Sequence, residues 1–219
     1  RFRTKLPQGY DCIQPEDGLH EIRHKTNQPF KYGFEPTFHS YRLNEPTKLK
    51  KPSTVFADSM ADLFGSWIPN SWIERILETV HRCPQHIFLF LTKNGCKMCE
   101  QGDVIDTENA WYGQTCTGSD TQPNNPIVDI PNGRHFLSFE PLLGDWIPDL
   151  RGLRVNWVII GSLNSNGKAV HPSKGGTKKE WVLEVIAEAE RLEIPIFIKS
   201  ELLGLYPDLP QKKDIPYLG

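Results

Sequence analysis

From residue 53 onward, the chain alternates short runs of apolar, β-branched and aromatic residues with turn-rich or helical stretches. The runs are nearly continuous in apolarity, a pattern typical of strands that are buried on both faces and therefore of a parallel sheet. We expect one mostly parallel sheet on this basis. Its six predicted strands span residues 54–57, 87–91, 110–113, 135–139, 156–160 and 194–198.

Two stretches between these runs have the period of an amphipathic helix. In residues 71–82, apolar side chains recur at i, i+1, i+4, i+5 and i+8, and apolar residues between 181 and 189 have the same spacing. Ser71 with Glu74, and Thr177 with Glu180, have the spacing of a capping box, which predicts where each helix begins. A helix followed within a few residues by a buried strand is typical of a βαβ crossover. The fold class is therefore α/β, with a TIM-like barrel or a doubly wound sheet as the two architectures.

Residues 1–52 have a different character from the rest of the chain. Prolines and glycines interrupt any helical period there, and ten Lys and Arg stand against six Asp and Glu. We predict an irregular basic extension or lid that packs on the surface or mouth of a barrel domain formed by residues 53–219. Its aromatic residues interleave with Lys and Arg, so they either anchor the extension to the barrel or stack bases beside neutralised phosphates.

The composition narrows the class of protein. With 219 residues and 38% hydrophobic residues, the chain is long enough for one good core and short for two. The net charge of −2 gives no compositional argument for a polyanion binder, and no apolar run reaches the roughly 18 residues that span a bilayer. Five cysteines without a signal-peptide pattern argue against a secreted disulfide framework. We expect a soluble cytoplasmic protein.

Polar residues follow almost every predicted strand. In parallel barrels the chemistry collects at the carboxyl ends of the strands, so these residues together predict a polar pocket for a zwitterionic or anionic ligand. Each one alone is equally compatible with a solvated loop or a helix cap. They are Asp58, Ser59 and Asp62; Thr92, Lys93 and Asn94; Gln114, Thr115 and Cys116; Glu140; Gly161 and Ser162; and Lys199, Ser200 and Glu201.

Five segments of the chain carry a family resemblance. They are residues 56–64, 84–86, 90–94, 139–144 and 157–161. In their order and spacing, from about residue 34 to 203, they resemble the phage-associated protein family distantly related to the radical SAM spore photoproduct lyases. The resemblance implies a partial TIM-type (βα) barrel that binds S-adenosylmethionine beside a [4Fe-4S] cluster. It leaves the substrate open, with nucleic acid as one class.

The resemblance and the strand order together suggest a role for each pocket residue. Glu140 and Lys93 form the polar floor and are the candidate catalytic residues, and Pro141 biases Glu140 toward extended backbone that aims its side chain at the barrel mouth. The expected cofactor-binding residues divide by the part of the ligand they hold. Ser59 and Asp62 hold the methionyl amino and carboxyl groups, Gln114 and Thr115 face the ribose or substrate, and Ser162 and Lys199 complete the set, with Lys199 on a carboxylate or phosphate.

The cysteines depart from the family pattern. Relatives carry a three-cysteine motif near the N-terminus that supplies the cluster ligands, and this chain has no such spacing. Either the sequence is a fragment without the cluster loop, or it is a cluster-less descendant. Cys96 and Cys99 have the CxxC spacing of half a zinc site or a redox pair, and they are equally compatible with ordinary reduced thiols. Cys12 and Cys116 are the candidates to complete a zinc site.

Three readings of the function stay open from the sequence. The first is a radical SAM-type enzyme, and the second is a cluster-less, non-catalytic barrel that binds nucleic acid or a partner protein. The third is a zinc-stabilised hydrolase that uses the strand-end carboxylates. One further motif bears on the second reading: the glycines of residues 174–179 lack Walker spacing, so this stretch is either a flexible lead into the following helix or a contact to a nucleic-acid backbone.

Overall fold

The computed structural model describes residues 18–28, 30–58, 61–101, 107–119 and 134–216, and these contain all six predicted strands. Every pair of neighbouring strands is parallel, so the predicted parallel sheet is confirmed. In chain order, which is also their order across the sheet, the strands are β3 (Thr54–Phe56), β4 (Ile87–Thr92), β5 (Ala110–Thr115), β6 (Arg134–Phe139), β7 (Trp157–Ile160) and β10 (Ile196–Ile198).

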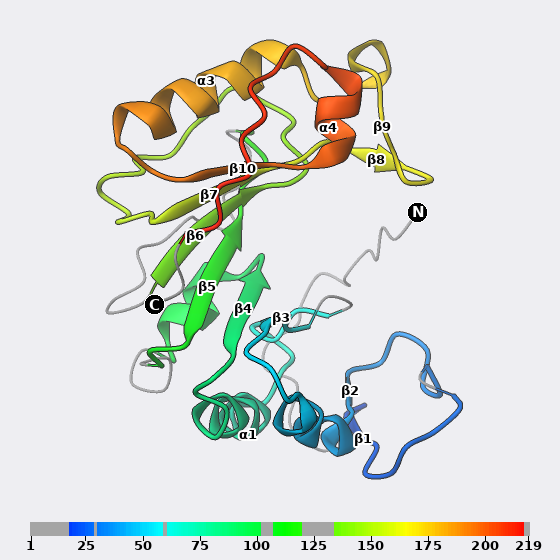
Figure 1. Ribbon diagram of the computed structural model, residues 1–219. Coiled ribbons are helices and arrows are strands. Elements are labelled where there is room, and N and C mark those ends of the chain that lie inside the picture. Colours follow the sequence, from blue (N-terminus) through cyan, green and yellow to red (C-terminus); the bar gives the residue numbers. More distant parts are fainter. Residues whose placement is uncertain (1–17, 29, 59–60, 102–106, 120–133, 217–219) are drawn as a thin grey trace.

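The strand order runs through the sheet without reversal, as in a barrel and unlike a doubly wound sheet. The sheet curls into a half-barrel whose edge strands are β3 and β10 (Figure 1). The edge of β10 is paired with the segment near the C-terminus, because the Ile198 amide donates to the Lys212 carbonyl and the Asp214 amide donates to the Ile196 carbonyl, both at 2.9 Å. Two-residue strands at the edges of the fold make two further small sheets.

Four α-helices connect or follow the strands of the half-barrel in the described part of the chain. They are α1 (Asn70–His81), α2 (Gly95–Cys99), α3 (Lys179–Arg191) and α4 (Ser200–Leu205). α1 links β3 to β4 and α3 links β7 to β10, which are the two predicted crossovers. No helix in the described ranges is long and apolar enough to cross a membrane.

Both predicted capping boxes are wrong. α1 begins after Pro69 and α3 begins after Lys178, and neither helix receives a side-chain cap from the described residues. The physical reason is clear for Thr177. Its hydroxyl is buried and donates to the Leu142 carbonyl at 2.8 Å, so a tertiary bond replaces the local cap. Spacing alone cannot distinguish these two uses of a threonine hydroxyl.

The convex face of the sheet is covered by helices and holds two apolar clusters. α1 buries Ile73, Leu77 and Val80 against the outward side chains of β4 and β5, among them Phe90 and Tyr112. The other cluster joins α3 and α4 to the outward side chains of β6, β7 and β10. The alternation of side chains along each strand then sends the remaining residues to the concave face.

The concave face is lined with large apolar side chains. Leu89, Trp111, Phe136 and Trp157 form a third cluster there, and the rings of Phe136 and Trp157 have their centroids 5.5 Å apart. Gly113 lies beneath the Phe136 ring, and a Cβ on this glycine would come within 2.2 Å of a ring carbon. The interior is therefore filled by side chains along the strands.

The described part of the N-terminal extension packs on the outside of α1. It contains β1 (His20–Glu21), β2 (Thr37–Phe38) and the 3₁₀ helices η1 (Ser40–Asn44) and η2 (Pro46–Lys48). Arg75 of α1 donates to the Glu21 carboxylate at 2.9 Å and lies over the Phe38 ring, which also stacks on Trp72. Phe38 of the extension thus serves as an anchor, one of the two uses that the sequence suggested for its aromatic residues.

Candidate functional site

The carboxyl edge of the half-barrel gathers most of the predicted site residues. Because all six strands run parallel, the residues that follow them lie at one edge of the sheet. The predicted arrangement of Glu140 and Lys93 at the same end is therefore confirmed. Ser59 lies outside the described residues. The described residues at this edge include Asp58, Asp62, Lys93, Thr115, Glu140, Gly161, Ser162 and Lys199.

An ion pair between Glu140 and Lys199 is the central feature of this edge. The Lys199 ammonium donates to Glu140 Oε1 at 2.5 Å, and the two side chains are 36% and 26% exposed, respectively. The register explains the contact, since Phe139, Ile160 and Ile198 are level across β6, β7 and β10. The next residues, Glu140, Gly161 and Lys199, are therefore level too, and side-chain alternation places all three on the concave face.

Gly161 lets the two charged side chains meet across β7. A Cβ on this glycine would lie 3.1 Å from both Cγ and Cδ of Glu140, which is tighter than ordinary van der Waals contact. The Glu140 side chain thus rests on the bare backbone of the strand between its own and that of Lys199. The peptide bond between Glu140 and Pro141 is cis. The edge therefore presents a carboxylate and an ammonium side by side over a glycine.

Lys93 does not take part in this pair, although the sequence predicted that it forms the polar floor together with Glu140. Thr92 is level with Gln114 and therefore with Leu137, which places Lys93 level with Ser138. Glu140 lies two residues farther along the barrel axis. The Lys93 side chain is exposed instead of sharing the polar floor. This stagger between neighbouring strands cannot be seen in the sequence.

The Asp62 carboxylate joins the loop after β3 to the end of β4. Its Oδ1 accepts from the Thr92 hydroxyl at 2.6 Å and from the Phe64 amide at 3.1 Å, and its Oδ2 accepts from the Lys93 amide at 2.9 Å. Three donors thus occupy a side chain that was expected to hold a ligand amino group. Asp62 is in the first place a positioning residue that fixes the shape of this part of the edge.

Asp58, close to Asp62, combines an unusual backbone conformation with a buried carboxyl oxygen. Its backbone is left-handed, with φ of 55°, and its Oδ2 is buried with no hydrogen-bond partner in the described part of the chain. Burial raises the pKa of this carboxyl to about 6, with a further increase from the Asp62 charge and an opposing effect of Arg42. A strained backbone and an unpartnered buried oxygen are costs that proteins tolerate mostly at functional sites.

Asp58→Asn is expected to stabilise the protein at neutral pH. Between the ordinary pKa of 3.8 and about 6, the folded state holds a proton on Asp58 that the unfolded chain has released, so raising the pH through this window destabilises the wild type. Asparagine removes that dependence and tolerates the left-handed backbone. The gain in free energy of unfolding should be about 3 kcal/mol at pH 7, at about 1.4 kcal/mol for each unit of the pKa difference, and should fall below about 1 kcal/mol near pH 4. Urea denaturation of both proteins at the two pH values measures it, and an equal gain at both would contradict this account.

Three further predicted residues have different surroundings. Gln114 is buried on the convex face, where its Nε2 lies 3.1 Å from His135 Nε2, so the expectation that it faces the pocket is wrong. Thr115, one residue later, is buried on the concave face. Ser162 is buried and donates to Asn164 Oδ1 at 2.9 Å, at the base of the loop that follows β7. Period-two alternation separates Gln114 from Thr115, and it would have excluded one of the two from the sequence alone.

The described cysteines do not form a metal centre. The short helix α2 carries the exposed Cys96 and the half-buried Cys99. Cys116 lies within the apolar cluster beneath α3, and burial raises the pKa of its thiol to about 11, so it is not placed to complete a zinc site with that pair. Among the residues that the structure describes, no group of three or more His, Cys, Asp or Glu side chains is arranged to hold a metal ion. Cys12 lies outside the described residues.

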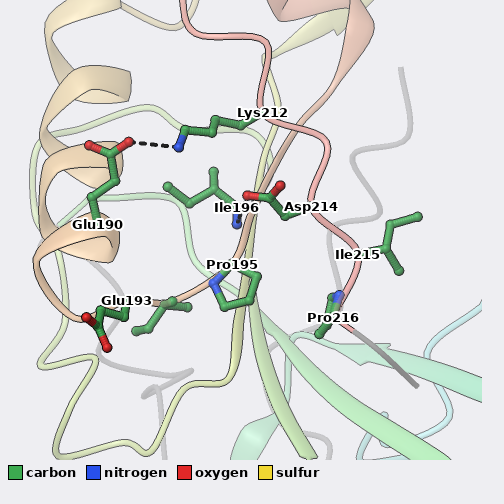
Figure 2. A pocket seen from close by; sticks show the side chains of 9 residues that line it. Glu190, Glu193, Pro195, Ile196, Lys212, Asp214, Ile215 and Pro216 are labelled. Carbon is green, nitrogen blue, oxygen red and sulfur yellow. Dashed lines mark hydrogen bonds and ion pairs between the residues drawn. The ribbon is translucent and has the colours of Figure 1, made fainter. Parts of the chain in front are cut away.

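A cavity of about 470 Å³ lies at the opposite end of the sheet (Figure 2). It is bounded by the end of α3, the start of β10 and the segment around Asp214. Glu190 and Lys212 form an ion pair of 3.0 Å across its wall. Because the cavity adjoins the amino end of β10, it is remote along the strand from Lys199. It therefore forms no part of the candidate site at the carboxyl edge.

Comparison with known proteins identifies a family. Residues 12–206 match the family model described as "Protein of unknown function (DUF5131)", and the chain belongs to this family. A search of curated proteins found no match. A search of solved structures found none either.

Proposed function

We propose that this protein binds S-adenosylmethionine at the carboxyl edge of its half-barrel and is a phage-associated radical SAM-type enzyme, as the sequence resemblance implies, and that it is cytoplasmic, as its composition indicates. The observation that carries the proposal is the ion pair of Glu140 and Lys199 across Gly161. The methionyl end of S-adenosylmethionine is a zwitterion, with an α-ammonium and an α-carboxylate one carbon apart. The edge offers the two complementary charges side by side.

On binding, the ion pair between Glu140 and Lys199 would be replaced by two ion pairs between these residues and the ligand. Its ammonium group would donate to the Glu140 carboxylate, and its carboxylate would accept from the Lys199 ammonium. Hydrogen bonds between charged groups are about twice as strong as those between neutral ones. Both side chains are about one-third exposed, so they retain part of their hydration and can change partners without a large desolvation cost.

The concave face next to this pair suits the nucleoside. Ile159 and Phe197 are half-buried on that face and lie two residues before Gly161 and Lys199, respectively. Apolar side chains with a few polar groups are the ordinary lining of a small-molecule site. Thr115 supplies a hydroxyl on the same face for the ribose.

The radical step of the proposal is supported by the resemblance and not by ligands in the described chain. A four-iron cluster is held by cysteine thiolates, and the described residues contain no set of three that could hold it. Such a cluster would supply the electron for reductive cleavage of S-adenosylmethionine. We therefore assign no residue of this chain to the cluster. The alternative function is a cluster-less barrel that binds nucleic acid or a partner protein without catalysis.

A calorimetric series with ligand analogues tests the proposed binding. S-adenosylmethionine and S-adenosylhomocysteine both carry the zwitterion, and we expect similar affinities for them. Decarboxylated S-adenosylmethionine lacks the partner of Lys199, and 5′-methylthioadenosine lacks both charged groups. Relative to S-adenosylmethionine, we expect decarboxylated S-adenosylmethionine to bind about tenfold more weakly and 5′-methylthioadenosine at least a hundredfold more weakly. Each lost charge-assisted contact costs about 1.4 kcal/mol or more. Equal affinity for 5′-methylthioadenosine would contradict recognition of the zwitterion, and no binding of any of the four would overturn the proposal.

A further inference from the structure

The loop between β7 and α3 concentrates positive charge. Residues 161–179 contain four lysines and one histidine and no Asp or Glu, although the whole chain has a net charge of −2. Lys168, His171, Lys174 and Lys178 are exposed, whereas Lys179 is paired with Asp208. Lys178 lies over the Trp181 ring, with its ammonium 4.7 Å from the centroid. The loop is therefore a strongly cationic segment on a weakly acidic protein.

The topology brings this loop to the carboxyl edge of the sheet. It leaves the end of β7 at Gly161, directly beside the pair of Glu140 and Lys199, and returns at the start of α3. Part of it forms a hairpin of β8 (Asn164–Ser165) and β9 (Lys168–Ala169), which extends from the body of the protein (Figure 1). Asn166 and Gly167 make the two-residue turn with positive φ, as type I′ hairpins require.

The loop is built as a fixed scaffold. Asn164 donates through Nδ2 to Glu201 Oε1 at 3.2 Å and accepts from the Ser162 hydroxyl, which ties the first strand of the hairpin to α4 and to the end of β7. Gly176 packs so closely that a Cβ would come within 1.8 Å of the Val170 carbonyl oxygen. The exposed lysines are thus carried on an ordered backbone, so less conformational entropy is lost when they bind.

An exposed tryptophan lies on the adjoining loop. Thr177 at the base of the cationic loop donates to Leu142, and the loop after β6 continues from there to Trp146, which is 40% exposed. The Trp146 amide donates to the Gly118 carbonyl at 2.9 Å, so its backbone is fixed. After Glu140, this loop also carries the acidic residues Asp145 and Asp149. An exposed indole on an ordered backbone, in the loop next to a cationic one, is a combination that can bind unpaired bases and their phosphates.

We infer that the cationic loop and the Trp146 loop together form a binding surface for single-stranded nucleic acid. Lys168 and Lys174 contact phosphates, and a base stacks on the Trp146 ring. The inference rests on the charge, the exposure and the hydrogen bonds of these two loops, and not on binding of S-adenosylmethionine. If both hold, the bound strand passes the edge where Glu140 and Lys199 lie, and a nucleotide is the substrate class.

The test uses fluorescence anisotropy with a labelled 20-nucleotide DNA strand, the RNA of the same sequence, the DNA duplex and heparin. We expect the single strands to bind more tightly than the duplex. Lys168→Ala with Lys174→Ala should weaken single-strand binding about tenfold at low salt. In this double variant, the slope of log affinity against log salt concentration should become about 1.4 less steep, because each of the two lost phosphate contacts contributes about 0.7 to the slope. Binding of either single strand supports the inference, and the ratio of their affinities identifies DNA or RNA.

Two controls separate this surface from general charge effects. Lys50→Ala with Lys51→Ala removes two exposed lysines from the basic extension, before the amino end of β3, and should change the affinity less than twofold. Trp146→Ala should weaken single-strand binding about tenfold and leave heparin binding unchanged, while Trp146→Phe should keep most of the affinity. S-adenosylmethionine affinity should be the same in the Lys168 and Lys174 variant as in the wild type.

The inference is overturned by any of three results. The first is no binding of either single strand at low salt. The second is a loss in the Lys50 and Lys51 variant that equals the loss in the Lys168 and Lys174 variant, which would move the surface to the N-terminal extension. The third is tighter binding of duplex than of single strands, or a loss of heparin binding in Trp146→Ala that equals its loss of single-strand binding. Either result would show that bases do not stack on Trp146.

Discussion

Phe136→Ala is expected to lower the free energy of unfolding by about 3–5 kcal/mol. The Phe136 side chain is fully buried at the centre of the concave face, where it contacts Trp157 and covers Gly113. Truncation removes a large apolar group and leaves a cavity that the rigid strands on either side cannot close. Urea denaturation measures the change. Phe56→Ala, on the edge strand β3 where the ring is 47% exposed, is the matched control and should cost less than about 1 kcal/mol.

The same site makes a reciprocal prediction about Gly113. A Cβ there would come within 2.2 Å of the Phe136 ring, so Gly113→Ala should cost about 1–3 kcal/mol through overpacking. In the double variant Gly113→Ala with Phe136→Leu, the smaller side chain gives the new methyl group room. The combined cost should be less than the sum of the two single costs, because the residues are in contact. Strict additivity would show that Gly113 and Phe136 do not share this space.

The sheet could be predicted from the sequence because its signal is local. Each strand is an apolar run, and two of the connections carry an amphipathic helix, so burial on both faces and parallel pairing follow from the pattern. Strand order and curvature needed the structure, since TIM-like and doubly wound sheets share that pattern. The predicted start of the second helix was wrong for a related reason. The hydroxyl of Thr177 has the spacing of a cap, but it donates to the carbonyl of Leu142, 35 residues away in the sequence.

The sequence predicted that the candidate site lies at the carboxyl edge of the sheet, but not which of its residues contact one another. Parallel strands guarantee that Glu140, Lys93 and Lys199 lie at the same end, and the sequence indicated that much. Which lysine meets Glu140 depends on the stagger between strands and on the bare backbone of Gly161, and neither is encoded in a residue spacing. The unpartnered oxygen of Asp58 likewise depends on three-dimensional packing.

Glu140→Gln is expected to weaken S-adenosylmethionine binding about tenfold or more while leaving the free energy of unfolding within roughly 1 kcal/mol of the wild type. Glutamine keeps the shape that rests on Gly161, and its carbonyl oxygen can still accept from Lys199. It removes the negative charge that the α-ammonium of the ligand requires. The reciprocal Lys199→Met change should weaken binding to a similar degree through the α-carboxylate.

A second ion pair provides a matched control. Lys212 and Glu190 are separated by 3.0 Å, with side chains 34% and 51% exposed, but this pair lies against α3 on the convex side of the sheet, whereas Glu140 and Lys199 lie on the concave face. Lys212→Met therefore removes a comparable surface ion pair without touching the carboxyl edge. Its affinity for S-adenosylmethionine should equal that of the wild type.

Calorimetric titration of S-adenosylmethionine into the wild type, Glu140→Gln and Lys212→Met tests the central claim most directly. The account predicts measurable binding to the wild type, the same affinity in Lys212→Met, and a loss of about tenfold or more in Glu140→Gln with the fold intact. Equal affinities in all three proteins would contradict it by removing Glu140 and Lys199 from the binding site.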